Sequence, residues 1–161
     1  MINYFISIIT KLRDNRNKVI NHNYITLNER VSDIIISKDI KLITLTVTEK
    51  GYHSDKDKKL NYSKDIINDL ENKNLNTVIG HISFGLIQRF KLNKEKIIIM
   101  SCDNLSENSN ILKNLIYEFL TKIYPQCLKW FLSNVEFPLS MVDGIVPVSY
   151  THLTLPTIVS V

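Results

Sequence analysis

The fold is decided by the stretch Ile97-Ile98-Ile99-Met100-Ser101-Cys102-Asp103-Asn104-Leu105. It begins with a short apolar run rich in β-branched residues, which is typical of a buried strand in a parallel sheet. The chain then changes at once to small and polar residues, and a helical pattern follows. A strand, a polar turn and a helix in this order mark the edge where open α/β sheets bind ligands, beyond the carboxyl ends of their strands.

Asn104 has two interpretations at this position. Its amide carries both a donor and an acceptor, so it is suited to hold a substrate oxygen at the edge of a sheet. Alternatively, Asp103 and Asn104 only turn the chain and cap the next helix. Taken alone, the stretch favours the turn and the cap.

The segment before this stretch predicts one strand and two helices. Residues 42–47 form a β-branched run and predict a strand. Ser63 precedes a short helical pattern over 64–70, and Thr77 precedes a longer one that runs to Phe90. Each of these two hydroxyl residues is therefore expected to cap a helix.

After the stretch, residues 112–123 have the apolar spacing of a strong amphipathic helix. Pro125 ends this helix, because proline cannot continue it without penalty. Another short helix around Trp130 is expected next. Strands separated by helices predict an α/β layer architecture with parallel strands.

The first part of the chain carries weaker signals. Residues 4–9 have the composition of a strand. Residues 12–23 are polar and are typical of a loop or a hairpin. Residues 31–36 are compatible with a short helix or a short strand, and the sequence does not decide between them.

The composition is that of a soluble globular domain. The chain has 161 residues, of which 44% are hydrophobic and 22% charged, enough for one domain with a real core. No apolar run approaches the ~20 residues of a membrane helix. Polar residues interrupt the apolar run at 2–9, so a signal peptide is not expected. Cys102 and Cys127 have no metal-type spacing, and they predict reduced thiols in a cytoplasmic protein.

The net charge of +4 leaves a second function class open, a small non-catalytic basic module that binds an acidic partner or nucleic acid. The densest cluster, Lys56-Asp57-Lys58-Lys59, contains an acid. It is expected to be a solvated loop. The sequence has no aromatic and basic RNA motif and no zinc-finger spacing, so neither nucleic acid nor a membrane is expected as a partner.

Three stretches together resemble one family, the long-chain mannitol dehydrogenase and fructuronate reductase group of polyol and sugar-acid (hexuronate) oxidoreductases. The stretches are Thr44-Leu45-Thr46-Val47-Thr48-Glu49-Lys50-Gly51-Tyr52, then Ser101-Cys102-Asp103-Asn104-Leu105 followed by Asn108, then Phe137-Pro138-Leu139-Ser140-Met141-Val142-Asp143. They occur in the family's order and at comparable spacing, and they cover about residues 40–146.

The resemblance implies a Rossmann-type domain that binds NAD, with NADP not excluded. It implies hydride transfer between the nicotinamide and an open-chain polyol or hexuronate, without a metal. The substrate class is that of a fructuronate reductase or a mannitol 2-dehydrogenase. A lysine in a C-terminal domain is the family's acid/base, and asparagines hold the reacting oxygen. The oligomeric state stays open.

The resemblance also assigns site residues. Asn104 matches the first of the family's catalytic asparagines. Glu49 and Asp143 match positions that line the cofactor and substrate cleft. Thr48 and Ser101 are expected near the nicotinamide half of the cofactor. With Asn104 placed in this order, its catalytic interpretation replaces the capping one.

Departures from the family pattern indicate an incomplete site. Ser109 stands where the family usually has glycine, Leu139 where it has asparagine, and Gly144 where it has arginine. None of the four glycines forms a Gly-x-Gly turn, so the loop that cradles the cofactor phosphates is missing. The lysine-containing domain is missing too. We therefore expect a partial parallel Rossmann-type sheet with flanking helices, lacking the first Gly-rich βαβ unit and the C-terminal helical domain.

The domain prediction is accordingly that residues 1–147 form an internal fragment of an N-terminal dinucleotide-binding domain, inactive as written. Its sheet is expected to have an unpaired edge where the first strands are lacking. Residues 148–161 resemble a translated sequencing adapter and are expected to be non-native, which removes His152 as a general base. The alternative for this tail is a natural edge strand.

Overall fold

The structure is a computed structural model, and it describes residues 5–9, 22–25, 34–71, 75–103 and 105–140. A five-stranded sheet has the order β2-β1-β3-β4-β5. The strands are β1 (Phe5–Ile9), β2 (His22–Ile25), β3 (Leu42–Thr46), β4 (Ile97–Ser101) and β5 (Val135–Glu136). The helical elements are η1 (Glu49–Tyr52), α2 (Lys64–Leu70), α3 (Val78–Leu92), α4 (Asn108–Ile123), η2 (Pro125–Cys127) and α5 (Leu128–Asn134).

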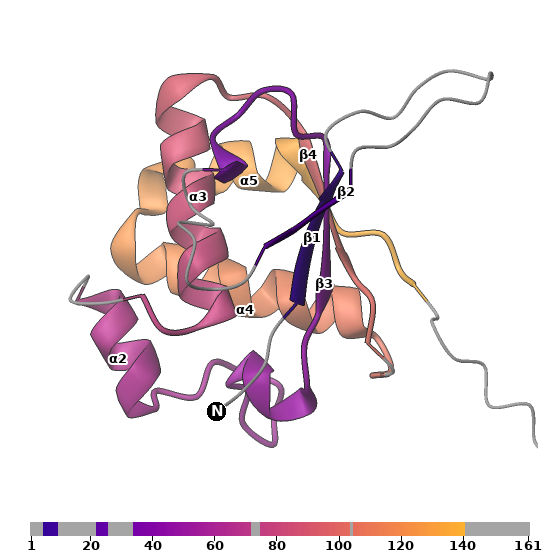
Figure 1. Ribbon diagram of the computed structural model, residues 1–161. Helices are drawn as coiled ribbons and strands as arrows, with labels where there is room; N and C mark the ends of the chain where they lie inside the picture. The colour runs from indigo at the N-terminus through magenta and orange to yellow at the C-terminus, as the bar shows by residue number, and fades with distance from the viewer. Residues whose placement is uncertain (1–4, 10–21, 26–33, 72–74, 104, 141–161) are drawn as a thin grey trace, which may run out of the picture.

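The strands β3, β4 and β5 are parallel, which confirms the predicted α/β fold class. Each connection between them passes through helices, and α3, α4 and α5 lie on the same face of the sheet (Figure 1). The buried residues alternate along β3 and β4, as expected for strands with one face against the core. Parallel neighbours of this kind bring their carboxyl ends to one edge.

The expectation of an unpaired edge beside β3 is wrong. Strand β1 pairs with β3 in the antiparallel sense, and β2 pairs with the other edge of β1, also antiparallel. The strand predicted over 4–9 is therefore confirmed as β1. The loop or hairpin predicted over 12–23 lies almost entirely outside the described residues. Strand composition carries no information about strand direction, so the sequence predicted β1 as a strand but not its antiparallel pairing with β3 and β2.

The predicted helix caps are confirmed. The Ser63 Oγ accepts a hydrogen bond of 3.4 Å from the Ile66 N–H, and the Thr77 Oγ1 accepts one of 3.0 Å from the Gly80 N–H. The buried Asp69 carboxylate lies beside the second cap and accepts from the Thr77 N–H. A Cβ at Gly80 would stand 2.1 Å from the Asp69 Oδ2, so this corner between α2 and α3 requires glycine.

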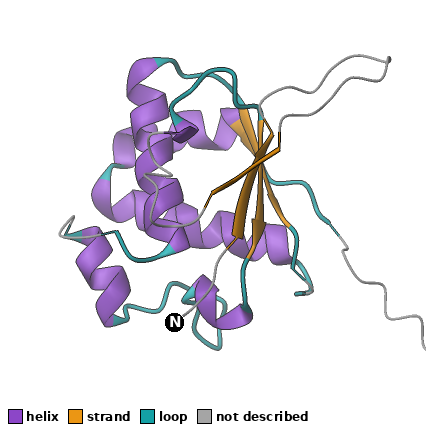
Figure 2. Cartoon of the chain, viewed as in Figure 1, coloured by secondary structure: helices purple, strands orange, loops and turns teal. Residues whose placement is uncertain are grey.

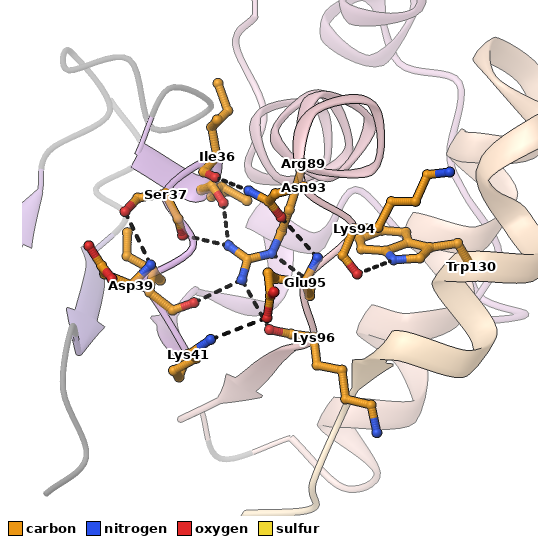
Figure 3. A network of polar contacts seen from close by, with 12 residues as sticks. Ile36, Ser37, Asp39, Lys41, Arg89, Asn93, Lys94, Glu95, Lys96 and Trp130 are labelled. Carbon is orange, nitrogen blue, oxygen red and sulfur yellow. Dashed lines mark hydrogen bonds and ion pairs between the residues drawn. The ribbon is translucent and has the colours of Figure 1, made fainter.

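A fully buried guanidinium, that of Arg89 on α3, lies at the amino ends of β3 and β4 (Figure 3). All five of its N–H groups donate to backbone carbonyls at 2.7–3.0 Å, those of Ile35, Ser37, Ile40, Glu95 and Lys96. Burial lowers the pKa of Arg89, and the nearby Glu95 carboxylate opposes that shift. The side chain thus joins the turn that leads into β3 to the turn that leads into β4.

Two neighbouring contacts extend this network. The Asn93 Nδ2 donates to the Ile36 carbonyl at 2.6 Å, and the Trp130 Nε1 donates to the Lys94 carbonyl at 2.8 Å. The second contact joins helix α5 to the turn that leads into β4 (Figure 3). Among the described helices, none has both the length and the apolar character that a membrane-spanning helix requires.

Replacing Arg89 by lysine should destabilise the fold by about 2–4 kcal/mol, because an ammonium has three donors and leaves at least two buried carbonyls unpaired. Chemical denaturation followed by circular dichroism measures this change. Gln88→Lys is the matched control, since residue 88 is exposed on the same helix and its replacement should cost less than about 0.5 kcal/mol. Equal losses for the two variants would contradict the role of Arg89.

Candidate functional site

The carboxyl ends of β3 and β4 meet at one edge of the sheet. Leu45 of β3 lies opposite Ser101 of β4, and the Cys102 N–H donates to the Leu45 carbonyl at 2.6 Å. The loops that follow both strands leave the sheet at this end (Figure 2). The predicted ligand-binding edge is therefore present where the parallel strands place it.

A buried polar cluster joins the two strand ends. Tyr52 belongs to η1, which follows β3, and only 1% of its surface is exposed. Its hydroxyl lies 2.5 Å from the Ser101 Oγ and donates to the Asp103 carboxylate. Ser101 also donates to that carboxylate, at 2.5 Å. One carboxylate oxygen thus receives hydroxyl groups from both strand ends.

Asn108, the first residue of α4, brings the third family motif to the same place. Its Nδ2 donates to the carbonyls of Ser101 and Asp103 at 3.3 and 3.0 Å. It also lies 3.4 Å from both the carbonyl oxygen and the Oγ of Ser140. Ser140 itself donates through its Oγ to the Ser101 carbonyl. Residues from all three motifs therefore meet around Ser101.

The electrostatics of the cluster centre on Asp103. Burial raises the pKa of this carboxyl above its ordinary 3.8, and the Leu105 N–H and the Asn108 amide partly offset the rise. The folded chain therefore binds this proton more tightly than the unfolded chain does. Stability from this group is fully present below the unfolded pKa and is lost as the pH rises through the folded-state pKa.

The predicted site residues divide into three groups. Thr48 and Glu49 are exposed at the carboxyl end of β3. Ser101 is fully buried, and its hydroxyl is hydrogen bonded within the protein. Asn104 and Asp143 lie outside the described residues, so their placement stays a prediction.

Sequence reasoning missed Tyr52, Asp103, Asn108 and Ser140 as members of the site. Each of them stands inside one of the three motifs, which was the available signal, but only folding places them together. Cys102 is half-buried between them, and burial raises the pKa of its thiol. Within the described ranges, no three His, Cys, Asp or Glu side chains gather as a metal ion would require.

A family model described as the mannitol dehydrogenase Rossmann domain matches residues 4–161. The chain belongs to this family. The resemblance drawn from the three motifs is therefore confirmed, and so is the fold class that it implies.

Two characterised relatives show how far the similarity extends. The D-mannonate oxidoreductase of Escherichia coli is 38% identical over 109 residues, which are 66% of this chain and 22% of the relative. The mannitol 2-dehydrogenase of Neosartorya fischeri is 32% identical over 114 residues, or 68% of this chain and 23% of the relative. The chain thus spans about a quarter of the length of these relatives.

Two solved structures share the fold. A D-sorbitol dehydrogenase in substrate-free form superposes with a TM-score of 0.65 at 28% identity, over 70% of this chain and 24% of that one. A Pseudomonas fluorescens mannitol 2-dehydrogenase, in a ternary complex with NAD and D-mannitol, superposes with a TM-score of 0.59 at 24% identity. The second match covers 82% of this chain and 29% of the neighbour, and it is evidence of fold alone.

Replacing Tyr52 by phenylalanine should raise the pKa of Asp103 further, because a hydroxyl that stabilises the carboxylate is removed. A titration of the Asp103 carboxyl carbon by NMR measures this pKa in both proteins. Tyr62→Phe is the control, since the Tyr62 hydroxyl bonds to Glu118 and not to Asp103. If the pKa of Asp103 is equal or lower in the Tyr52 variant, the bond from the Tyr52 hydroxyl does not stabilise the Asp103 carboxylate.

Proposed function

We propose that this chain is part of the cofactor-binding domain of an NAD-dependent oxidoreductase that transfers hydride to or from an open-chain polyol or hexuronate. The observation that carries the proposal is the meeting of three family motifs around Ser101, at the edge where such sheets bind ligands. The names of the two relatives, a mannonate oxidoreductase and a mannitol 2-dehydrogenase, support this substrate class.

The described residues fit one half of a nicotinamide dinucleotide. Exposed Thr48 and Glu49 offer oxygen atoms at the strand ends, as the hydroxyl-rich ribose beside the nicotinamide requires. The pyrophosphate finds no cradle among the described glycines. Gly51 is buried in η1, and Gly80 and Gly85 pack inside α3 against Asp69 and Ile35. Nothing in these residues separates NAD from NADP.

Two predicted residues complete the proposed chemistry. The bound cofactor accepts or supplies the hydride. Asn104 donates a hydrogen bond from its amide to the reacting oxygen of the substrate, and Asp143 lines the same cleft. The acid/base that moves the hydroxyl proton is the family's lysine, which none of the three motifs supplies. The polypeptide alone is therefore inactive.

The finer assignments belong to the same proposal. The domain comprises residues 1–147, and 148–161 are an adapter-derived tail. The reaction is of the fructuronate reductase or mannitol 2-dehydrogenase type. A cytoplasmic location accords with two free thiols, at Cys102 and Cys127.

If the chain holds only the nicotinamide half of the cofactor site, its affinities for a cofactor fragment and for the whole cofactor should be similar. Reduced nicotinamide mononucleotide should bind nearly as tightly as NADH, because the adenosine and its phosphate find few partners. Two-dimensional NMR of the 161-residue chain measures both affinities. The amides of Thr48, Glu49, Cys102 and Asp103 should shift, and adenosine monophosphate should leave them unchanged.

Two variants test the assignment of Glu49. Glu49→Ala should weaken binding of both reduced nicotinamides roughly tenfold, as expected for the loss of about 1.4 kcal/mol. Asp65→Ala, which removes an exposed acid on α2, should not. Shifts confined to residues away from the strand ends would overturn the cofactor assignment. Oxidation of D-mannonate or mannitol by the purified chain would overturn its inactivity.

A further inference from the structure

We infer that Asn108 is a positioning residue that holds the 101–105 turn against the segment leading to Asp143. The inference rests on the proposed function, because Asn104 stands in the turn and Asp143 follows the segment. It concerns a side chain that touches neither cofactor nor substrate. Its role is to keep two parts of the proposed site in one arrangement.

The contacts of Asn108 carry the inference. Its side-chain amide faces four oxygens, two in the 101–103 backbone and two on Ser140, at 3.0–3.4 Å. Only 1% of Asn108 is exposed, so water does not compete for these contacts. The Ser140 Oγ donates to the same Ser101 carbonyl. The amide therefore links two segments that lie more than thirty residues apart in sequence.

One Asn108 contact and one Asp103 contact restrain the backbone on the two sides of position 104. On one side, the Asp103 carbonyl accepts from Asn108 at 3.0 Å. On the other, the Leu105 N–H donates to the Asp103 Oδ1 at 3.0 Å. The turn is thus fixed at both neighbours of the proposed catalytic asparagine.

A helix cap alone does not account for these contacts. The residue before Asn108, Glu107, occupies the N-cap position, with a positive φ of 59° and no side-chain capping bond. The Asn108 Oδ1 accepts from the Ser109 N–H at 2.6 Å, which satisfies one helix donor. Its Nδ2 instead faces the carbonyl oxygens of Ser101, Asp103 and Ser140. A left-handed Glu107 costs about 1 kcal/mol or more, so the local backbone does not favour this start of α4 by itself.

The site also explains why serine at 109 is compatible with this arrangement. Its hydroxyl donates to the Pro138 carbonyl at 2.5 Å, two residues before Ser140. The departure from the family's usual glycine therefore adds a second link between α4 and the third motif. Asn108 and Ser109 together hold that segment beside β4.

The variant Asn108→Asp tests the inference in the 161-residue chain. It keeps the shape and the acceptor of the side chain but replaces its donors by an oxygen that faces other oxygens. Asn110→Asp, at an exposed position in the same helical turn, is the matched control for added charge. Amide hydrogen exchange and binding of reduced nicotinamide mononucleotide are measured by NMR in both.

We expect the hydrogen-bonded amides of Cys102 and Leu105 to exchange at least roughly tenfold faster in Asn108→Asp, while those of β1 and β3 keep their rates. The affinity for the mononucleotide should fall in parallel, and Asn110→Asp should change neither. Unchanged exchange at both amides would overturn the inference. Equal acceleration throughout the sheet would also overturn it, since that result indicates a general loss of stability.

Ser140→Ala provides a second test if Asn108→Asp does not fold. It removes only the hydroxyl that bonds to the Ser101 carbonyl, and should accelerate exchange of the neighbouring Cys102 amide but not of the amides in α3. No acceleration at Cys102 overturns the inference. If exchange in the variants changes as expected but the wild-type chain binds no mononucleotide, the proposed function is refuted and the positioning role of Asn108 stands.

Discussion

The buried guanidinium of Arg89 is the interaction on which the parallel half of the sheet depends. No buried carboxylate of the described residues pairs with it, and its charge is solvated by five backbone carbonyls. A buried charge is tolerated only when all its donors are paired, so the two turns that supply those carbonyls must stay together. Because these turns lead into β3 and β4, the guanidinium sets how the two strands enter the sheet.

The candidate site lies at the opposite ends of β3 and β4, and its arrangement follows from the pairing of these two strands. With β3 and β4 in register, Leu45 lies opposite Ser101, and the segments that follow them pack against each other. Tyr52, Asp103 and Asn108 then form a polar network that has few alternative hydrogen-bond arrangements, because an unpaired polar group there would cost free energy. Thr48 and Glu49, which precede Tyr52 in the same motif, stay exposed.

Much of the architecture was predictable from local patterns. The β-branched runs of β3 and β4, the caps Ser63 and Thr77 and the stop at Pro125 are signals that depend on neighbouring residues only. The strand β1 was predicted too, but its antiparallel pairing was not, because strand direction depends on partners distant in sequence. Nothing in the sequence indicated that the charged Arg89 of α3 is fully buried while Phe90 beside it is only half-buried.

The site shows the same division between sequence and structure. By itself, the sequence determined the family, the α/β class and the motifs whose residues gather at the strand ends, since these follow from residue types in a given order. Only the tertiary structure decided which motif residues face solvent and which are buried in the network. It turned the Ser101 hydroxyl inward, and it brought Tyr52 to that hydroxyl and Ser140 to the Ser101 carbonyl. The reason is physical, because hydrogen bonds between residues about 30 to 50 positions apart form only when the sheet has set the distance between them.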